Sequence, residues 1–314
     1  MSEWSLTVSI AIGVVFYLAI PGGGAFAVRH RWRRFRARVL AAREMRDLDY
    51  PAVHGHRQAY GDDSSRRGTF RFFGKLEAVE GQTCIWIGDD SLSVVIDLVG
   101  VPIYILPGGG ARGEGLPDET PRIVFWKELT ALAEGTDFLV VGDIVERQGT
   151  LHFDRGSADI PLVIIYDCPR EQLFARATWS GRQRNEYWNH LTPVSLVGGF
   201  LAETLWALTL ADRSLLQAII AMVLGLVPVL PLMPPGVVGF FWYRRIWRVA
   251  RRLRAQRDLA FVRGASASAT QLSSHARDLS RKAWHREVGA VVLLMVSIFV
   301  NGYLIAAATA LLIR

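Results

Sequence analysis

Four long apolar runs with almost no charge dominate the hydrophobic pattern of the chain. A helix needs about 20 predominantly apolar residues to span a bilayer, because its backbone polar groups must be satisfied without water. Each run is long enough, and only the second contains a charged residue, Glu203. The pattern therefore predicts four transmembrane helices, over residues 6–28, 191–211, 215–243 and 288–313.

Two of these runs contain residues that disfavour a straight helix. The first contains Pro21 followed by three glycines, and the third contains Pro228, Pro231, Pro234 and Pro235. Proline lacks the amide donor and clashes with the preceding turn, so we expect breaks at both places. A kink that fits an overlong segment into the bilayer is one interpretation, and a transport path lined by broken helices is the other.

Arginines flank the apolar runs on one side of the predicted membrane. By the positive-inside rule this side is the cytoplasm, so residues 29–190 and 244–287 are expected there and both termini outside, as in a bacterial inner-membrane protein. Residues 29–67 form a basic juxtamembrane helix and linker, and residues 244–287 form a basic helical hairpin. The arginines expected to contact anionic lipid headgroups are Arg29, Arg31, Arg33, Arg34, Arg36, Arg38, Arg244, Arg245, Arg248, Arg251 and Arg252.

Short runs rich in Val, Ile, Phe and Thr, separated by Gly and Asp turns, fill residues 68–170 and are typical of strands. We expect an α+β membrane protein with a small all-β barrel or sandwich inserted on its cytoplasmic side. A juxtamembrane helix over 171–190 is expected to lead into the second membrane segment. The seven expected strands are 69–76, 83–87, 92–98, 101–106, 138–145, 150–153 and 162–166. The stretch 123–134 is ambiguous, with a strand over 123–126 and a helix over 127–134 as its interpretation.

The stretch from Gly135 to about Leu208 reads GTDFLVVGDIVERQGTLHF, then PLVIIYDCPREQLFARATW, then a membrane segment that begins LTPVSLVGGF. This resembles the membrane-proximal domain of the GIDE/MULAN type, found in mitochondrial membrane-bound ubiquitin ligases and bacterial relatives. The resemblance implies a fold between two membrane segments. It does not imply ligase activity, because two cysteines cannot build the RING domain of those ligases.

Composition and motifs narrow the chemistry. Apolar residues make up 51% of the chain, and 36 basic residues exceed 29 acidic ones. No nucleophile elbow, Walker loop or HExxH motif is present, so we expect no catalytic site, cofactor or metal. The glycine run 108–113 is interpreted as a hairpin loop, and His54 and His56 as solvated linker residues. Lipids and a protein partner or second copy are the expected partners, and nucleic acid is not.

Glu203 is the strongest candidate for function. An ionisable group at mid-membrane costs on the order of 3 kcal/mol, so it should face the bundle interior. Gly199 and Ala207 lie one turn away on either side and leave a groove for another helix. Asn301 and Gln217 are its expected polar partners. Two interpretations stay open: a neutral Glu203 that hydrogen-bonds Asn301 and fixes packing, or a proton or cation site.

The leading functional hypothesis is a non-enzymatic sensor or scaffold whose β domain binds a protein or small ligand and is coupled to the helix bundle. The alternative is a transport or pore-forming effector, for example in envelope stress or phage defence, that uses the broken helices and Glu203. A membrane-bound enzyme with a site assembled from distant residues is the third hypothesis.

Overall fold

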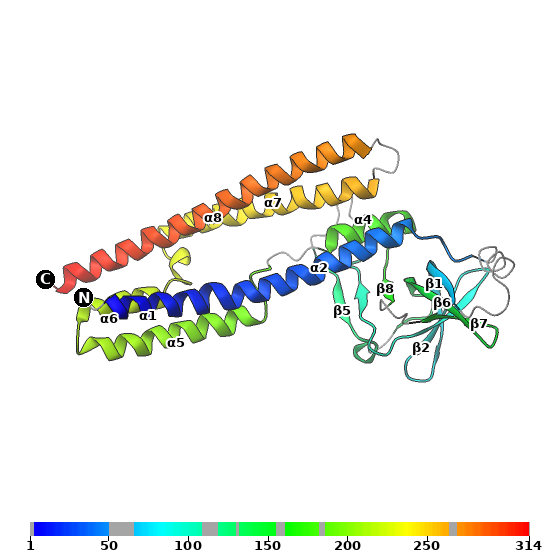
Figure 1. The fold of residues 1–314 in the computed structure, drawn as a ribbon, viewed down its shortest axis with the longest axis horizontal. Coiled ribbons are helices and arrows are strands. Elements are labelled where there is room, and N and C mark those ends of the chain that lie inside the picture. The colour runs from blue at the N-terminus through cyan, green and yellow to red at the C-terminus, as the bar shows by residue number, and fades with distance from the viewer. Residues whose placement is uncertain are drawn as a thin grey trace. The chain divides into compact units, whose positions relative to one another are not determined.

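The computed structural model describes residues 3–49, 66–108, 119–129, 132–154, 161–181, 186–263 and 269–313. The chain is an α+β protein with two compact units, a helix bundle and a β-barrel (Figure 1). The bundle unit consists of Met1–Arg31 and Arg184–Arg314, and the barrel unit is Trp32–Gln183. The glycine run beyond Gly108 and the linker histidines lie outside the described residues.

Among the described residues, three helices are long and apolar enough to cross a membrane, which associates the chain with a membrane. They are Trp4–Glu44, Leu191–Ala211 and Ser274–Thr309. The first consists of α1 (Glu3–Gly13), the π-helix η1 (Val14–Ala19) and α2 (Ile20–Glu44) without interruption. The second is α5 (Leu191–Ala211), and the third lies within α8 (Ala269–Ile313).

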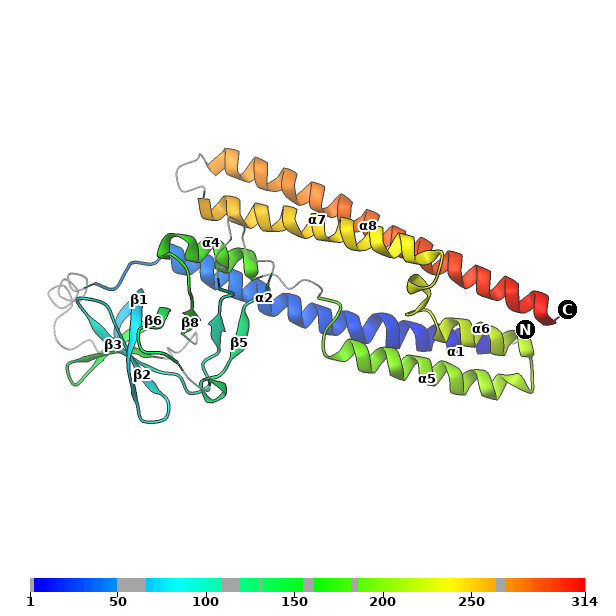
Figure 2. The ribbon, with the colours of Figure 1, turned by 180° about the vertical axis from the view of Figure 1, so that it is seen from behind.

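The third apolar run, 215–243, is not one helix. It is divided into α6 (Leu215–Gly225), the 3-10 turn η3 (Leu230–Leu232) and the start of α7 (Gly236–Arg263). The expected proline break is therefore confirmed, whereas a fourth continuous span is not. The turn is visible between α6 and α7 in Figure 2.

The break expected at Pro21 is wrong, because α2 continues through Pro21 and the three glycines that follow. The distortion lies one turn earlier, in η1. Pro21 has no amide to bond the carbonyl of Tyr17, and the Tyr187 hydroxyl donates to that carbonyl instead. A side chain from the neighbouring segment thus satisfies the group that proline leaves free.

Helices α7 and α8 form an antiparallel hairpin with small residues at its contact (Figures 1 and 2). On α8 the buried small residues recur every seven positions, at Ala276, Ala283, Ala290 and Ser297. A seven-residue repeat keeps one seam facing the partner helix. Gly239 of α7 lies so close to Ser297 that a Cβ would collide with its hydroxyl. The hairpin predicted over 244–287 is thus present as the continuation of these two helices.

The barrel unit contains eight strands among its described residues. Five of them close a ring in the order β1-β2-β3-β7-β6-β1, and β8, β4 and β5 extend from β6. The only parallel pair within the ring is β3–β7. This order is that of the five-stranded Greek-key barrel called the OB-fold. The strands are β1 (Arg66–Glu80), β2 (Cys84–Gly88), β3 (Ser93–Asp97), β4 (Ile103–Ile105), β5 (Arg122–Val124), β6 (Asp137–Arg147), β7 (Thr150–Asp154) and β8 (Leu162–Ile165).

Strand β1 closes the barrel because it pairs on both sides. Residues 69–75 pair with β6 and residues 75–80 pair with β2, with a bulge between Leu76 and Ala78. A bulge bends a strand and increases its twist, which closure of a small barrel requires. Of the two expected architectures the structure therefore has the barrel. All seven expected strands are present, and the ambiguous stretch contributes the short strand β5, followed by the 3-10 turn η2 (Trp126–Glu128).

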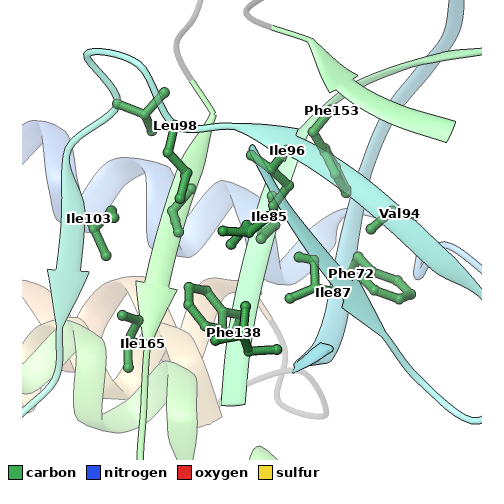
Figure 3. Close-up of a cluster of buried hydrophobic side chains, with 14 of the residues drawn as sticks. Phe72, Ile85, Ile87, Val94, Ile96, Leu98, Ile103, Phe138, Phe153 and Ile165 are labelled. Atoms are coloured by element: carbon green, nitrogen blue, oxygen red, sulfur yellow. The ribbon is translucent and has the colours of Figure 1, made fainter. Parts of the chain in front are cut away.

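The barrel interior is filled by branched and aromatic side chains that alternate along the strands (Figure 3). Phe138 and Ile85 are completely buried, and the core also includes Phe72, Ile87, Val94, Ile96, Leu98, Ile103, Phe153 and Ile165. Side chains thus fill the interior between the described strands, as is usual for a small barrel.

Two helices pack within the barrel unit. Trp32, Phe35, Val39 and Ala42 form a buried stripe along α2, at the spacing of one helical face. The ring of Phe35 lies 4.4 Å from that of Tyr104 on β4, and Arg36 donates to the carbonyl of Gly181. This carbonyl follows α4 (Arg170–Ser180). The helix expected over 171–190 therefore ends at Ser180, and residues 186–190 are not helical.

The C-terminal end of α2 is fixed by Arg71 of β1. Its guanidinium donates to the carbonyls of Arg43 and Ala42 and pairs with Asp47. Arg170 also pairs with Asp47 and stacks over Phe73 at 3.7 Å. Because the last carbonyls of a helix lack internal partners, a positive side chain at this position stabilises the end of α2.

Candidate intramembrane polar site

Glu203 lies on the buried face of α5 and is completely inaccessible to solvent. The buried residues of α5 follow one another at intervals of three and four, and all but the last are small or polar: Thr192, Ser195, Gly199, Glu203, Ala207 and Leu210. The expectation that Glu203 faces the bundle interior is therefore met by the structure. The spacing of the face is that of a helix whose one side packs on neighbours while the rest faces lipid.

The first helix, and not α8, fills the groove beside Glu203. A Cβ on Gly199 would lie 2.5 Å from Cε1 of Tyr17 and 2.7 Å from Cβ of Phe16. Both of these residues belong to η1. The hydroxyl of Ser195 donates to the carbonyl of Phe16, so a side chain of α5 also satisfies a carbonyl of the π-turn. π-turns are frequent at functional sites, so the contact between η1 and α5 is a candidate for function.

The end of α6 forms the other wall. Gly225 is the last residue of α6, and a Cβ there would lie 3.1 Å from Cβ of Glu203. The Tyr17 hydroxyl donates to the Gly225 carbonyl at 3.0 Å. The C-terminal end of a helix carries partial negative charge, so it disfavours a second negative charge nearby.

The Glu203 carboxyl has no hydrogen-bond partner among the described residues at either oxygen. The buried Ser9 hydroxyl lies close enough to act as a donor to a charged Glu203, although it does not have the geometry of a regular hydrogen bond. No basic side chain stands among the residues that line it. A buried polar group without a partner is rare in folded proteins and calls for an explanation.

The two expected partners of Glu203 bind elsewhere. Asn301 donates through Nδ2 to the carbonyls of Leu230 at 2.5 Å and Met233 at 2.7 Å. It therefore satisfies the irregular backbone around η3, where carbonyls lack helical partners. Gln217 accepts a hydrogen bond of 2.9 Å from the hydroxyl of Ser5. The hypothesis of a Glu203–Asn301 hydrogen bond is wrong.

A small pocket begins beside Gln217 and leads along the first helix. It is lined by Ser5, Leu6, Ser9, Leu210, Gln217 and Ile220. Sequence reasoning missed Ser5, Ser9 and Tyr17. The two serines stand four apart in a mostly apolar helix, and this spacing places them on one face. Tyr17 gives no comparable signal, because the π-turn changes the face on which it lies.

The predicted headgroup arginines have different environments. Arg29, Arg31, Arg33 and Arg34 are exposed, as are Arg244, Arg245, Arg248 and Arg252. Arg36 is partly buried and bonded to Gly181, so it serves the packing of α2. Arg38 is partly buried, and Arg251 is partly buried over the ring of Trp247.

The barrel unit shows no activated catalytic group among its described residues. Burial raises the pKa of the Cys168 thiol, which is the opposite of what a nucleophilic cysteine needs. Burial also raises the pKa of Tyr166 to about 12, with Asp137 as a secondary cause. No group of three or more His, Cys, Asp or Glu side chains gathers where the structure is described, so these residues offer no metal site.

Glu203, at the contact of the first helix, α5 and α6, is the described residue with two buried oxygens that lack a partner. Single buried atoms without a partner also occur in Arg176, Thr178, Trp247 and Asn301. Comparison with protein-family models, with curated proteins and with solved structures gives no match.

Proposed function

We propose that the protein is a multi-pass membrane sensor or scaffold whose β-barrel binds a protein or small ligand and is coupled to the helix bundle. We also propose that the protein lies in the bacterial inner membrane, with the barrel in the cytoplasm and both termini outside. The GIDE/MULAN resemblance is part of the same proposal, because it implies a membrane-proximal domain between membrane segments.

One observation carries the coupling: a single helix contributes to both units. Within the bundle unit, Asn189 donates to the carbonyl of Pro21 and packs tightly against Gly24. Within the barrel unit, Phe35 and Val39 of the same α2 are buried and Arg71 binds its last carbonyls. A continuous helix is stiff over this length, so a shift at one end is passed to the other.

The outer face of the barrel supports a binding role. OB-type barrels bind ligands on the outer face of strands 2 and 3 and on the adjacent loops. Here that face carries the half-buried Trp86, whose indole donates to Glu80. It is bordered by exposed acids, which favour a cationic partner and oppose nucleic acid: Glu77, Glu80, Asp89, Asp90 and Asp97. The exposed arginines of α2 and α7 are proposed to bind anionic lipid headgroups.

The coupling can be measured by hydrogen exchange on the full chain in lipid vesicles. Gly199→Leu disturbs the bundle, and we expect faster exchange at residues 32–42 of the barrel unit. Insertion of Gly-Gly after Arg31 should abolish that response, whereas the same insertion after Ser266 should preserve it. If Gly199→Leu leaves residues 32–42 unchanged in the parent chain, the coupling proposal fails.

A transport or pore-forming effector is the second candidate, favoured by the broken run 215–243 beside Glu203. Transporters often place discontinuous helices and intramembrane acids at their substrate sites. Ion flux through purified protein in liposomes that Glu203→Gln abolishes would favour this candidate. Sealed liposomes would favour the sensor.

A further inference from the structure

Glu203 is the group in the bundle whose burial and lack of partners the sensor proposal leaves unexplained. Its side chain is fully buried and neither carboxyl oxygen has a hydrogen-bond partner among the described residues. The surrounding atoms are the small Gly199 and Gly225, the Ser9 hydroxyl and the ring of Tyr17. These neighbours neutralise no charge, and the C-terminal end of α6 opposes a negative one.

We propose that Glu203 is a proton-binding site, reached from the end of the bundle where α1 begins, and that its protonation is the input that the bundle senses. The role as input rests on the proposed sensor function. Proton binding itself does not, and is tested separately.

The space around Glu203 favours a proton over a metal ion. A sodium or calcium ion needs several oxygen ligands around it. Gly225 packs so closely on Glu203 that even a methyl group there would stand 3.1 Å from Cβ of Glu203. Among the described neighbours of Glu203, Ser9 is then the side chain whose oxygen could bind a metal ion.

Few other titratable groups face this site. Tyr17 of η1 is the one that interacts with Glu203. Helix α6 contains no acidic or basic residue, α5 contains only Glu203, and α1 contains only Glu3 at its first position. Glu3 and the turn residues Asp212 and Arg213 lie at the end of the bundle, so Glu203 is the ionisable group within the spans of α1, α5 and α6 beyond that end.

A small pocket and the polar side chains beside it lie between the end of the bundle and Ser9, the residue that interacts with Glu203. The pocket lined by Ser5, Ser9 and Gln217 starts near the turn between α5 and α6, which is at the same end as Glu3. Ser5 and Gln217 are hydrogen-bonded to each other, and Ser9 follows one turn further along α1. Beyond Glu203, the Tyr17 hydroxyl is held by the Gly225 carbonyl.

Protonation would change the packing at the π-turn. A protonated Glu203 is a hydrogen-bond donor, and the Gly225 carbonyl has a second lone pair to accept it. A deprotonated Glu203 repels that carbonyl. The two states therefore differ in how tightly the end of α6 is held to η1, which is continuous with α2.

Infrared difference spectroscopy of the full chain in lipid vesicles tests proton binding directly. We expect a carboxylic-acid C=O band that disappears as pH is raised and is absent from Glu203→Gln. The matched control, Glu171→Gln on the exposed surface of α4, should keep the band. A band that is missing from the parent at every pH, or that survives in Glu203→Gln, overturns the proposal.

Three further measurements test the proposal if Glu203→Gln does not fold. Tyr17→Phe frees the Gly225 carbonyl, so the band should shift to lower frequency as Glu203 donates to it; an unshifted band contradicts the site. Addition of sodium chloride at constant pH should leave the band in place, and its loss would identify a cation site instead.

The proposed route is tested by the rate at which deuterium replaces the proton of the Glu203 carboxyl. Gln217→Leu should slow this exchange, and an unchanged rate would refute the route.

The input role is judged by hydrogen exchange. Exchange at residues 14–25 should respond to pH in the parent and not in Glu203→Gln. If the infrared band titrates but exchange at these residues does not change, Glu203 binds a proton without acting as the input. Failure of the response at residues 32–42 alone would instead count against the coupling between units.

Discussion

The interiors of the barrel and of the bundle are built from different side chains. The barrel core consists of large branched and aromatic residues such as Phe138 and Ile85. The bundle contacts consist of Gly, Ala and Ser, with hydrogen bonds from Tyr17, Asn189 and Asn301. In water, burial of apolar area drives packing, whereas lipid is as apolar as a leucine side chain and gives no such drive. Close approach and buried hydrogen bonds hold the helices together instead.

The comparison predicts that loss of a large side chain matters most in the barrel. Phe138→Ala should destabilise the barrel by about 3–5 kcal/mol, because the cavity adds to the lost burial. Leu205→Ala, on the exposed surface of α5, should change stability by much less. Denaturant unfolding of the two variants, followed by the tryptophan fluorescence of the chain, measures both. Equal effects would refute the dependence of the barrel on its large buried side chains.

In the bundle the damaging change is addition of volume. Gly199→Val places atoms against Tyr17 and Phe16 and should cost about 1–3 kcal/mol, since the neighbours must shift. Gly22→Ala is the matched control, because no atom lies within 4 Å of a Cβ there. Thermal unfolding in detergent compares them. A Gly199 variant as stable as the Gly22 variant would show that this contact is loose.

Arg71 tests the polar contacts of the barrel unit. Arg71→Gln loses the hydrogen bonds to the last carbonyls of α2 and the pairing with Asp47, and should cost about 1–2 kcal/mol. Arg33→Gln, an exposed arginine of the same helix, should have almost no effect. Hydrogen exchange at residues 39–44 reports the difference. Equal protection in both variants would remove Arg71 as the end contact of α2.

The smallest expected effect concerns His152. Its pKa is lowered from 6.5, first by burial and then by Arg147. The unfolded chain therefore binds a proton at a higher pH than the barrel does. Above pH 6.5 His152 is neutral in both states and contributes nothing to the free energy of unfolding. As pH falls from 6.5 through the lowered pKa, protonation of the unfolded chain makes His152 destabilise the barrel. An NMR titration of the imidazole should give a midpoint below 6.5. A midpoint above it would contradict the burial.

The sequence allowed the strands of the barrel to be predicted because their interior and exterior residues alternate, and water on one side enforces that alternation. The run 171–190 was expected to be one helix, but the pattern carries no mark of the end at Ser180. Closure of the ring through both edges of β1 also has no local signature. In the bundle, the lipid-facing and interior positions are both apolar, so Glu203 was visible and its neighbours were not. The π-turn places Tyr17 in contact with Gly199 of α5, and regular helical spacing does not predict this contact.

The π-turn also has a consequence for how the chain tolerates changes in length. A π-turn bonds each amide five residues back instead of four, so it holds one residue more than the α-turn it replaces. Deletion of one residue between Val14 and Ala19 would let the first helix become regular without a rotation of α2 relative to α1. The same deletion between Ile20 and Arg31 would turn the buried stripe from Trp32 to Ala42 by about 100°. The first helix therefore has one place where a single residue can be gained or lost while both ends keep their faces.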